Sequence, residues 1–83
     1  MIIRYFAWLQ DHTGCSQEQI TCPPEVTTIE TLTSYLRSQS AGHEAALSQT
    51  KMIRVARNHE FASFDEPVQD NDEIAFFPPV TGG

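Results

Sequence analysis

The sequence is poor in basic residues. Only 5 of its 83 residues are Lys or Arg, whereas 11 are Asp or Glu, and the formal net charge is −6. Phosphate backbones are bound by clustered positive charge, so the composition argues against nucleic acid as a partner. The acidity fits a protein partner with a basic surface, and it fits equally well a small protein that is kept soluble by its charge.

Cysteine and clustered metal ligands are also scarce. The two cysteines, Cys15 and Cys22, lack the spacing of a zinc motif and are too few for a disulfide framework. His12, His43 and His59 stand far apart and share no metal-ligand spacing. We therefore expect no metal site, and we expect these histidines to be ordinary surface or loop residues.

Long hydrophobic runs are absent. The apolar segment at the N-terminus is short, contains Arg4 and has no charged leader before it, so it does not resemble a signal peptide. No segment approaches the ~20 apolar residues that span a bilayer. The sequence predicts a cytoplasmic protein with no membrane contact, and 83 residues suffice for one domain.

Five short segments have the composition of β-strands, and one has the periodicity of a helix. The first strand, residues 2–9, places Ile3, Tyr5 and Ala7 on one face, and Gly14 is expected in the turn that follows. The later strands are predicted at residues 18–22, 52–56, 61–63 and 73–77. A turn at residues 70–72 precedes the last strand, and Asn71 there tolerates the left-handed region.

The helix is expected to begin after Thr28 and to run to about Ser38. Thr28 is a good N-cap residue, and Thr27 with Glu30 could form a capping box instead. Apolar residues at i, i+3 and i+7 form one stripe along the helix: Ile29, Leu32 and Leu36. Residues 44–47 have the composition of a further helical turn.

This order of elements predicts an α+β fold of the β-grasp, or ubiquitin-like, type. A mixed sheet of about five strands is covered by one main helix, and the two most apolar strands, the first and the last, lie side by side in its centre. The domain is expected to span residues 1–77. Residues 78–83 follow as an extended, flexible tail that ends in Gly-Gly.

The tail is the strongest functional signal. Gly82 and Gly83 form the thinnest possible peptide, which fits a narrow tunnel and leaves the Gly83 carboxylate open to attack. We expect that carboxylate to be activated by ATP as an acyl-adenylate before a sulfur donor converts it to a thiocarboxylate. Pro78 and Pro79 end the sheet and direct the chain outward. The tail then reaches roughly 20 Å in extended form. The alternative is a frayed terminus without function.

Aromatic residues near the tail predict a docking surface. Phe76 and Phe77 point to opposite faces of the last strand, and the helix covers only one face. The other ring is expected to be exposed beside Phe6 or Phe61, where it would contact a partner. Alternatively, the short segments around it bury both rings.

Residues 70–83, which read Asp-Asn-Asp-Glu-Ile-Ala-Phe-Phe-Pro-Pro-Val-Thr-Gly-Gly, resemble the C-terminus of the small subunit of molybdopterin synthase, the MoaD family. Further agreement lies in residues 5–7, 28–32 and 63–68, so the resemblance covers most of the chain. Asn71 stands where the family has Gly. Residues 56–58 read Ala-Arg-Asn where the family has a Val-Asn segment, which leaves the partner contacts of this strand open.

The resemblance implies a sulfur carrier, which is not an enzyme by itself. An E1-like adenylating enzyme would consume ATP to activate Gly83, a persulfide would supply sulfur, and no cofactor would be permanently bound. The tail would insert into the large subunit of a heterotetrameric synthase, where lysines assist sulfur transfer to cyclic pyranopterin monophosphate. The residues expected to insert are Pro78, Pro79, Val80, Thr81 and Gly82.

Three other functions remain open from the sequence. The chain could be a sulfur carrier for thiamine thiazole or tRNA thiolation, or a protein modifier that is joined to lysines through Gly83. It could also be a cysteine enzyme that uses Cys15, with His12 nearby, or Cys22. A nucleophilic cysteine needs a base or a positive neighbourhood, and the sequence offers no complete site of this kind.

Overall fold

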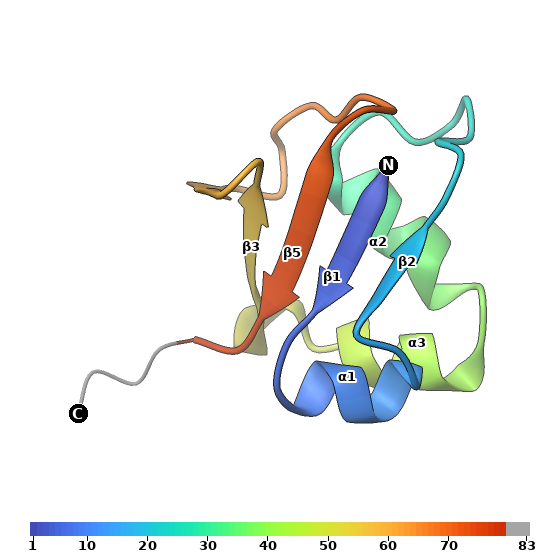
Figure 1. Ribbon diagram of the computed structural model, residues 1–83, viewed down its shortest axis with the longest axis vertical. Coiled ribbons are helices and arrows are strands. Elements are labelled where there is room, and N and C mark those ends of the chain that lie inside the picture. Colours follow the sequence, from blue (N-terminus) through green and yellow to red (C-terminus); the bar gives the residue numbers. More distant parts are fainter. Residues whose placement is uncertain (80–83) are drawn as a thin grey trace.

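The computed structural model describes residues 1–79, in which five strands form a single sheet. The helices lie on one side of this sheet (Figure 1). The strands are β1 (Ile2–Tyr5), β2 (Gln17–Gln19), β3 (Arg54–Arg57), β4 (Glu60–Ala62) and β5 (Glu73–Phe77). The helices are α1 (Trp8–Thr13), α2 (Ile29–Arg37), α3 (Ala41–Leu47) and a 3-10 turn, η1 (Thr50–Met52).

The sheet is mixed and has the strand order β2-β1-β5-β3-β4. β1 and β5 run parallel in the interior of the sheet, and every other pairing is antiparallel. Tyr5 lies opposite Phe76, and Arg54 lies opposite Phe77. The prediction that the first and last strands lie side by side is confirmed, and β5 has the predicted bounds.

The core lies between the sheet and the helices. Ile3 and Tyr5 on β1, and Ile74 and Phe76 on β5, are at most 1% exposed. The residues between them on these strands are partly exposed, because side chains alternate across a sheet. On α2 the predicted stripe is fully buried: Ile29, Leu32 and Leu36.

α2 begins at the predicted residue but with a different capping pair. The Thr28 hydroxyl accepts a hydrogen bond from the Thr31 backbone N–H (3.2 Å), and the Thr31 hydroxyl accepts one from the Thr28 N–H (2.9 Å). Thr31 thus takes the place that Glu or Gln has in the usual capping box. The alternative prediction, a capping box formed by Thr27 and Glu30, is wrong.

The first predicted strand is too long. β1 ends at Tyr5, and the chain turns at Ala7, which has a positive φ of 55°, before α1 begins at Trp8. Leu9, which belongs to this helix, is fully buried. Gly14 follows α1 in the left-handed region with φ 83°, as predicted, although it caps a helix here rather than closing a hairpin.

Within residues 1–79 there are three α-helices, of which α2 is the longest, and α1 lies at the end of the sheet, packed against α3 (Figure 1). Residues 44–47 belong to α3, which begins at Ala41 with Ser40 as its N-cap. Gly42 allows the close approach of α1, because a Cβ at this position would overlap the backbone carbonyl of His12. Ser40 and Gly42 therefore start and position a helix that is longer than the single turn expected from the sequence.

The remaining elements differ from expectation by a few residues. β2 begins at Gln17 and ends at Gln19, and β3 begins only at Arg54 because the residues before it form η1. The turn between β3 and β4 uses positive φ at Asn58 and His59, whereas Asn71 does not enter this region. Within residues 1–79, no helix has the length and apolar character needed to cross a membrane.

Candidate functional site

The chain leaves the sheet at the end of β5. The Phe6 backbone N–H donates to the Phe76 carbonyl (3.1 Å), and β3 pairs with β5 as far as Phe77. Pro78 and Pro79 follow outside the strand, because proline has no N–H to continue the ladder. β1 is parallel to β5, so α1 lies at the same end of the sheet (Figure 1). The tail thus begins at an edge bordered by Phe6, α1 and the start of β3.

Two phenylalanines lie together on the open face of the sheet, the face that the helices leave uncovered. The rings of Phe61 and Phe77 have centroids 5.8 Å apart, and we call these two residues the aromatic pair. Phe61 is 80% exposed, which is unusual for so large an apolar side chain. Next to the pair on this face, the cross-strand neighbours Ala56 and Ala75 have only small side chains. The expectation that one ring of the last strand lies beside Phe61 is confirmed, but Phe77 is half-buried rather than fully exposed.

Phe76 is fully buried, and its predicted docking role is wrong. Its ring stacks on Tyr5, with centroids 6.2 Å apart and an interplanar angle of 15°. The alternation along β5 points Phe76 into the core and Phe77 outward. Phe6 is 46% exposed, so its docking role remains a prediction, as do those of Phe61 and Phe77.

Sequence reasoning missed two exposed apolar residues. Trp8 is 36% exposed and Met52 is 52% exposed. Both line a hollow of about 250 Å³ together with side chains of α1, α3 and the segment before η1. The pattern assigned both residues to strands, and it is α1 and η1 that expose them.

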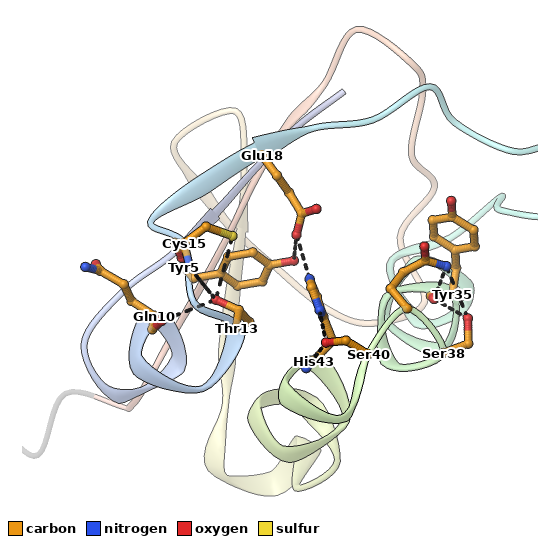
Figure 2. Close-up of polar contacts among 10 residues, drawn as sticks. Tyr5, Gln10, Thr13, Cys15, Glu18, Tyr35, Ser38, Ser40 and His43 are labelled. Atoms are coloured by element: carbon orange, nitrogen blue, oxygen red, sulfur yellow. Dashed lines mark hydrogen bonds and ion pairs between the residues drawn. The ribbon is translucent and has the colours of Figure 1, made fainter.

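A partly buried polar cluster connects β1, β2 and α3 (Figure 2). The Tyr5 hydroxyl donates to Glu18 Oε2 (2.7 Å), and His43 Nε2 lies 2.7 Å from the same oxygen. The Ser40 hydroxyl lies 2.7 Å from His43 Nδ1. We call Tyr5, Glu18, His43 and Ser40 the Glu18 clasp. His43 is 9% exposed, so its prediction as a surface or loop residue is wrong.

The Glu18 clasp has the connectivity of a structural tie. Burial raises the pKa of the Tyr5 hydroxyl far above its ordinary value, and the hydrogen bond to the Glu18 carboxylate raises it further. Tyr5 therefore stays a proton donor. Ser40, His43 and Glu18 are the residue types of a hydrolase triad. The Ser40 oxygen, however, also accepts a hydrogen bond from the His43 backbone N–H (3.1 Å), because Ser40 is the N-cap of α3.

The cysteines have the environment of structural residues. Cys15 and Cys22 are free and partly buried. Burial raises the pKa of the Cys22 thiol, and the nearby Asp70 carboxylate adds to the rise, which is opposite to what activates a nucleophile. The ring of His12 packs edge-on against Trp8. Within residues 1–79, no group of three His, Cys, Asp or Glu side chains could hold a metal.

The end of the tail falls beyond the part of the chain that the structure describes. Val80, Thr81, Gly82 and Gly83, which the sequence assigns to insertion and sulfur chemistry, lie outside residues 1–79. What the structure describes of the candidate site is therefore its root: Pro78, Pro79, the aromatic pair and Phe6.

The strand order, the helix α2 packed on one face of the sheet and the strand β5 that leads into the tail define a ubiquitin-like β-grasp protein (Figure 1). The model of the ThiS family matches residues 3–83. The chain is 36% identical to the molybdopterin synthase sulfur carrier subunit of Escherichia coli and 32% identical to that of Haemophilus influenzae, each over 98% of this chain and 96% of the relative. On this evidence the chain belongs to the ThiS family and groups with the molybdopterin synthase sulfur carrier subunits.

A solved structure shows the same fold. SAMP1 from Haloferax volcanii superposes with a TM-score of 0.70 at 28% identity, over 100% of this chain and 98% of that one. The β-grasp architecture expected from the sequence is thereby confirmed.

Proposed function

We propose that this chain is the sulfur carrier subunit of a molybdopterin synthase and that Gly83 carries the sulfur. The observation that supports this most directly is the match, along 98% of the chain, to relatives that are sulfur carrier subunits. The structure adds a suitable base for the tail. The strand that leads to it is held between two others, and the chain leaves the sheet at Pro78.

The chemistry follows from the Gly83 carboxylate. An oxygen of this carboxylate attacks the α-phosphate of ATP on an E1-like enzyme, forming an acyl-adenylate and releasing pyrophosphate. A persulfide sulfur then displaces AMP, and a thiol breaks the S–S bond of the product to leave a thiocarboxylate. The small glycine residues place little bulk around the carbonyl that is attacked.

In the synthase the carrier would be a donor subunit. Its tail, Pro78–Gly82, would insert into the large subunit, and the aromatic pair with Phe6 would dock beside the entrance. Aromatic side chains, phenylalanine included, are enriched at protein interfaces relative to the rest of the surface. The acceptor would be cyclic pyranopterin monophosphate, and lysines of the large subunit would assist in the transfer. Two transfers would build the dithiolene, and two carriers would bind a large-subunit dimer to give a heterotetramer.

The proposal is tested by following Gly83 in the intact protein. The full chain is incubated with the adenylating enzyme, ATP and a persulfide donor, and its mass is measured. We expect a mass gain that corresponds to the exchange of one oxygen for sulfur, located in the C-terminal peptide. A variant that lacks Gly83 should show no gain while keeping its circular dichroism spectrum.

Support of molybdopterin formation by the Gly83 deletion variant would overturn the proposal. The matched control is Cys15→Ser combined with Cys22→Ser, which should charge as the unmodified chain does. Loss of charging in this double variant would point to the cysteine alternative. Isopeptide adducts on cellular proteins would instead identify a protein modifier.

A further inference from the structure

Within residues 1–79, three of the four arginines are paired with carboxylates. Arg37 binds Glu44 through two hydrogen bonds of 2.8 Å. Arg4 lies 3.4 Å from Glu73, and Arg57 lies 3.4 Å from Glu66. Among residues 1–79, no carboxylate lies within 4 Å of the fourth arginine, Arg54.

Arg54 lies on the open face of the sheet, beside the tail root. It is exposed, it begins β3, and its cross-strand partner is Phe77. Side chains of directly opposed residues share a face, so Arg54 lies on the same face as the aromatic pair, next to Phe77. Its Nη1 donates to the Ile53 carbonyl (3.2 Å), and most of its five N–H donors have no acceptor among residues 1–79.

The charge pattern indicates what such a residue would recognise. With a net charge of −6, the chain is complementary to a basic surface. Arg54, which has no carboxylate partner among residues 1–79, would be repelled by such a surface unless a carboxylate faced it. An arginine fork binds a carboxylate in a fixed, bidentate geometry, which sets orientation as well as affinity.

We propose that Arg54 is a specificity-determining residue that pairs with a carboxylate of the synthase large subunit when the aromatic pair docks. The inference rests on the proposed function. The ion pair would fix the rotation of the carrier on its partner, so that the tail enters in one direction. A fixed local pair within oppositely charged surfaces selects orientation and partner more than it adds raw affinity.

The test compares two charge reversals in the full chain. Arg54→Glu and Arg37→Glu each remove one positive and add one negative charge, so both change the net charge from −6 to −8. Calorimetric titration with the large subunit should show that Arg54→Glu raises Kd at least about tenfold, because close interfacial charge pairs commonly contribute this much. Arg37→Glu should stay within about twofold, because surface charges far from an interface act mainly through screened long-range forces.

Two further arms make the result specific. Exchanging one interface carboxylate of the large subunit for Lys should restore binding of Arg54→Glu and weaken that of the unmodified chain. The loss caused by Arg54→Glu should shrink in high salt. Unfolding midpoints of both variants separate lost binding from lost folding.

Equal Kd values of Arg54→Glu and Arg37→Glu for the large subunit would overturn the proposed ion pair. The proposed sulfur carrier function would not be affected by that result. A loss confined to charging by the adenylating enzyme would also overturn the ion pair, because it would place the carboxylate there. Failure of the unmodified chain to bind the large subunit or to accept sulfur would instead overturn the proposed function, and the ion pair with it.

Discussion

At the scale of single residues, the backbone conformation of Ala7 sets where β1 ends. Ala7 has φ 55° and ψ −134°, a conformation that L-residues seldom adopt and that Gly adopts freely. This turn ends β1 after four residues and sends Leu9 into the core. An apolar run of Ile, Tyr, Phe and Trp does not reveal such a turn, since each residue alone favours a strand.

Gly42 is a second position of this kind, and its contact gives a direct prediction. Gly42→Ala should lower the free energy of unfolding by about 1–3 kcal/mol, the typical cost of overpacking, although Ala favours a helix. The reason is that its Cβ would overlap the backbone carbonyl of His12, and a backbone atom cannot move aside cheaply. Urea unfolding measures this change.

The matched control for Gly42→Ala is Ser34→Ala, at an exposed position of α2. It should change stability by less than about 0.5 kcal/mol, as surface substitutions usually do. Equal stability of the two variants would show that α1 and α3 do not approach as closely as the structure places them.

At the scale of elements, a polar tie supplements the apolar core. α3 packs against α1 and α2, and the Glu18 clasp adds hydrogen bonds from α3 and β1 to one carboxylate on β2 (Figure 2). β2 is an edge strand of three residues, too short to be held by its ladder alone. The clasp therefore helps to fix this strand.

The clasp is tested with two tyrosines. Tyr5→Phe should lower the free energy of unfolding by about 1.5 kcal/mol, because hydrogen bonds to charged groups contribute this order of energy and Glu18 would lose a donor. Tyr35→Phe is the control, since among residues 1–79 its hydroxyl makes no hydrogen bond. We expect little change for Tyr35→Phe, and equal effects of the two substitutions would contradict a role for the clasp.

At the scale of the whole molecule, folding and carrier function are divided along the chain. Every residue of the described core lies before position 77, and the last of them is Phe76. The root of the tail borders this core without belonging to it. Under the proposed function, such a division would let the tail serve an active site elsewhere while the domain keeps its stability.

Truncation tests this division. A chain that ends at Phe77 should unfold at the same denaturant midpoint as the full chain, and it should accept no sulfur. A chain that ends at Ala75 should lose about 3–5 kcal/mol or fail to fold, because it lacks the buried Phe76 ring. A large loss of stability in the longer truncation would place residues 78–83 within the folded unit.

The amino-acid sequence by itself determined the fold class, the bounds of β5, the start of α2 and the carrier hypothesis. These depend on short-range causes: residue alternation, a helical stripe, an N-cap and two prolines that cannot extend a ladder. Only the tertiary structure shows that Phe76 is fully buried while Phe77 is half-buried on the open face, and that His43 joins Glu18. Only the structure shows that Arg54 lies opposite Phe77 with no carboxylate of residues 1–79 within 4 Å. These facts depend on which distant segments meet, and no local pattern contains that information.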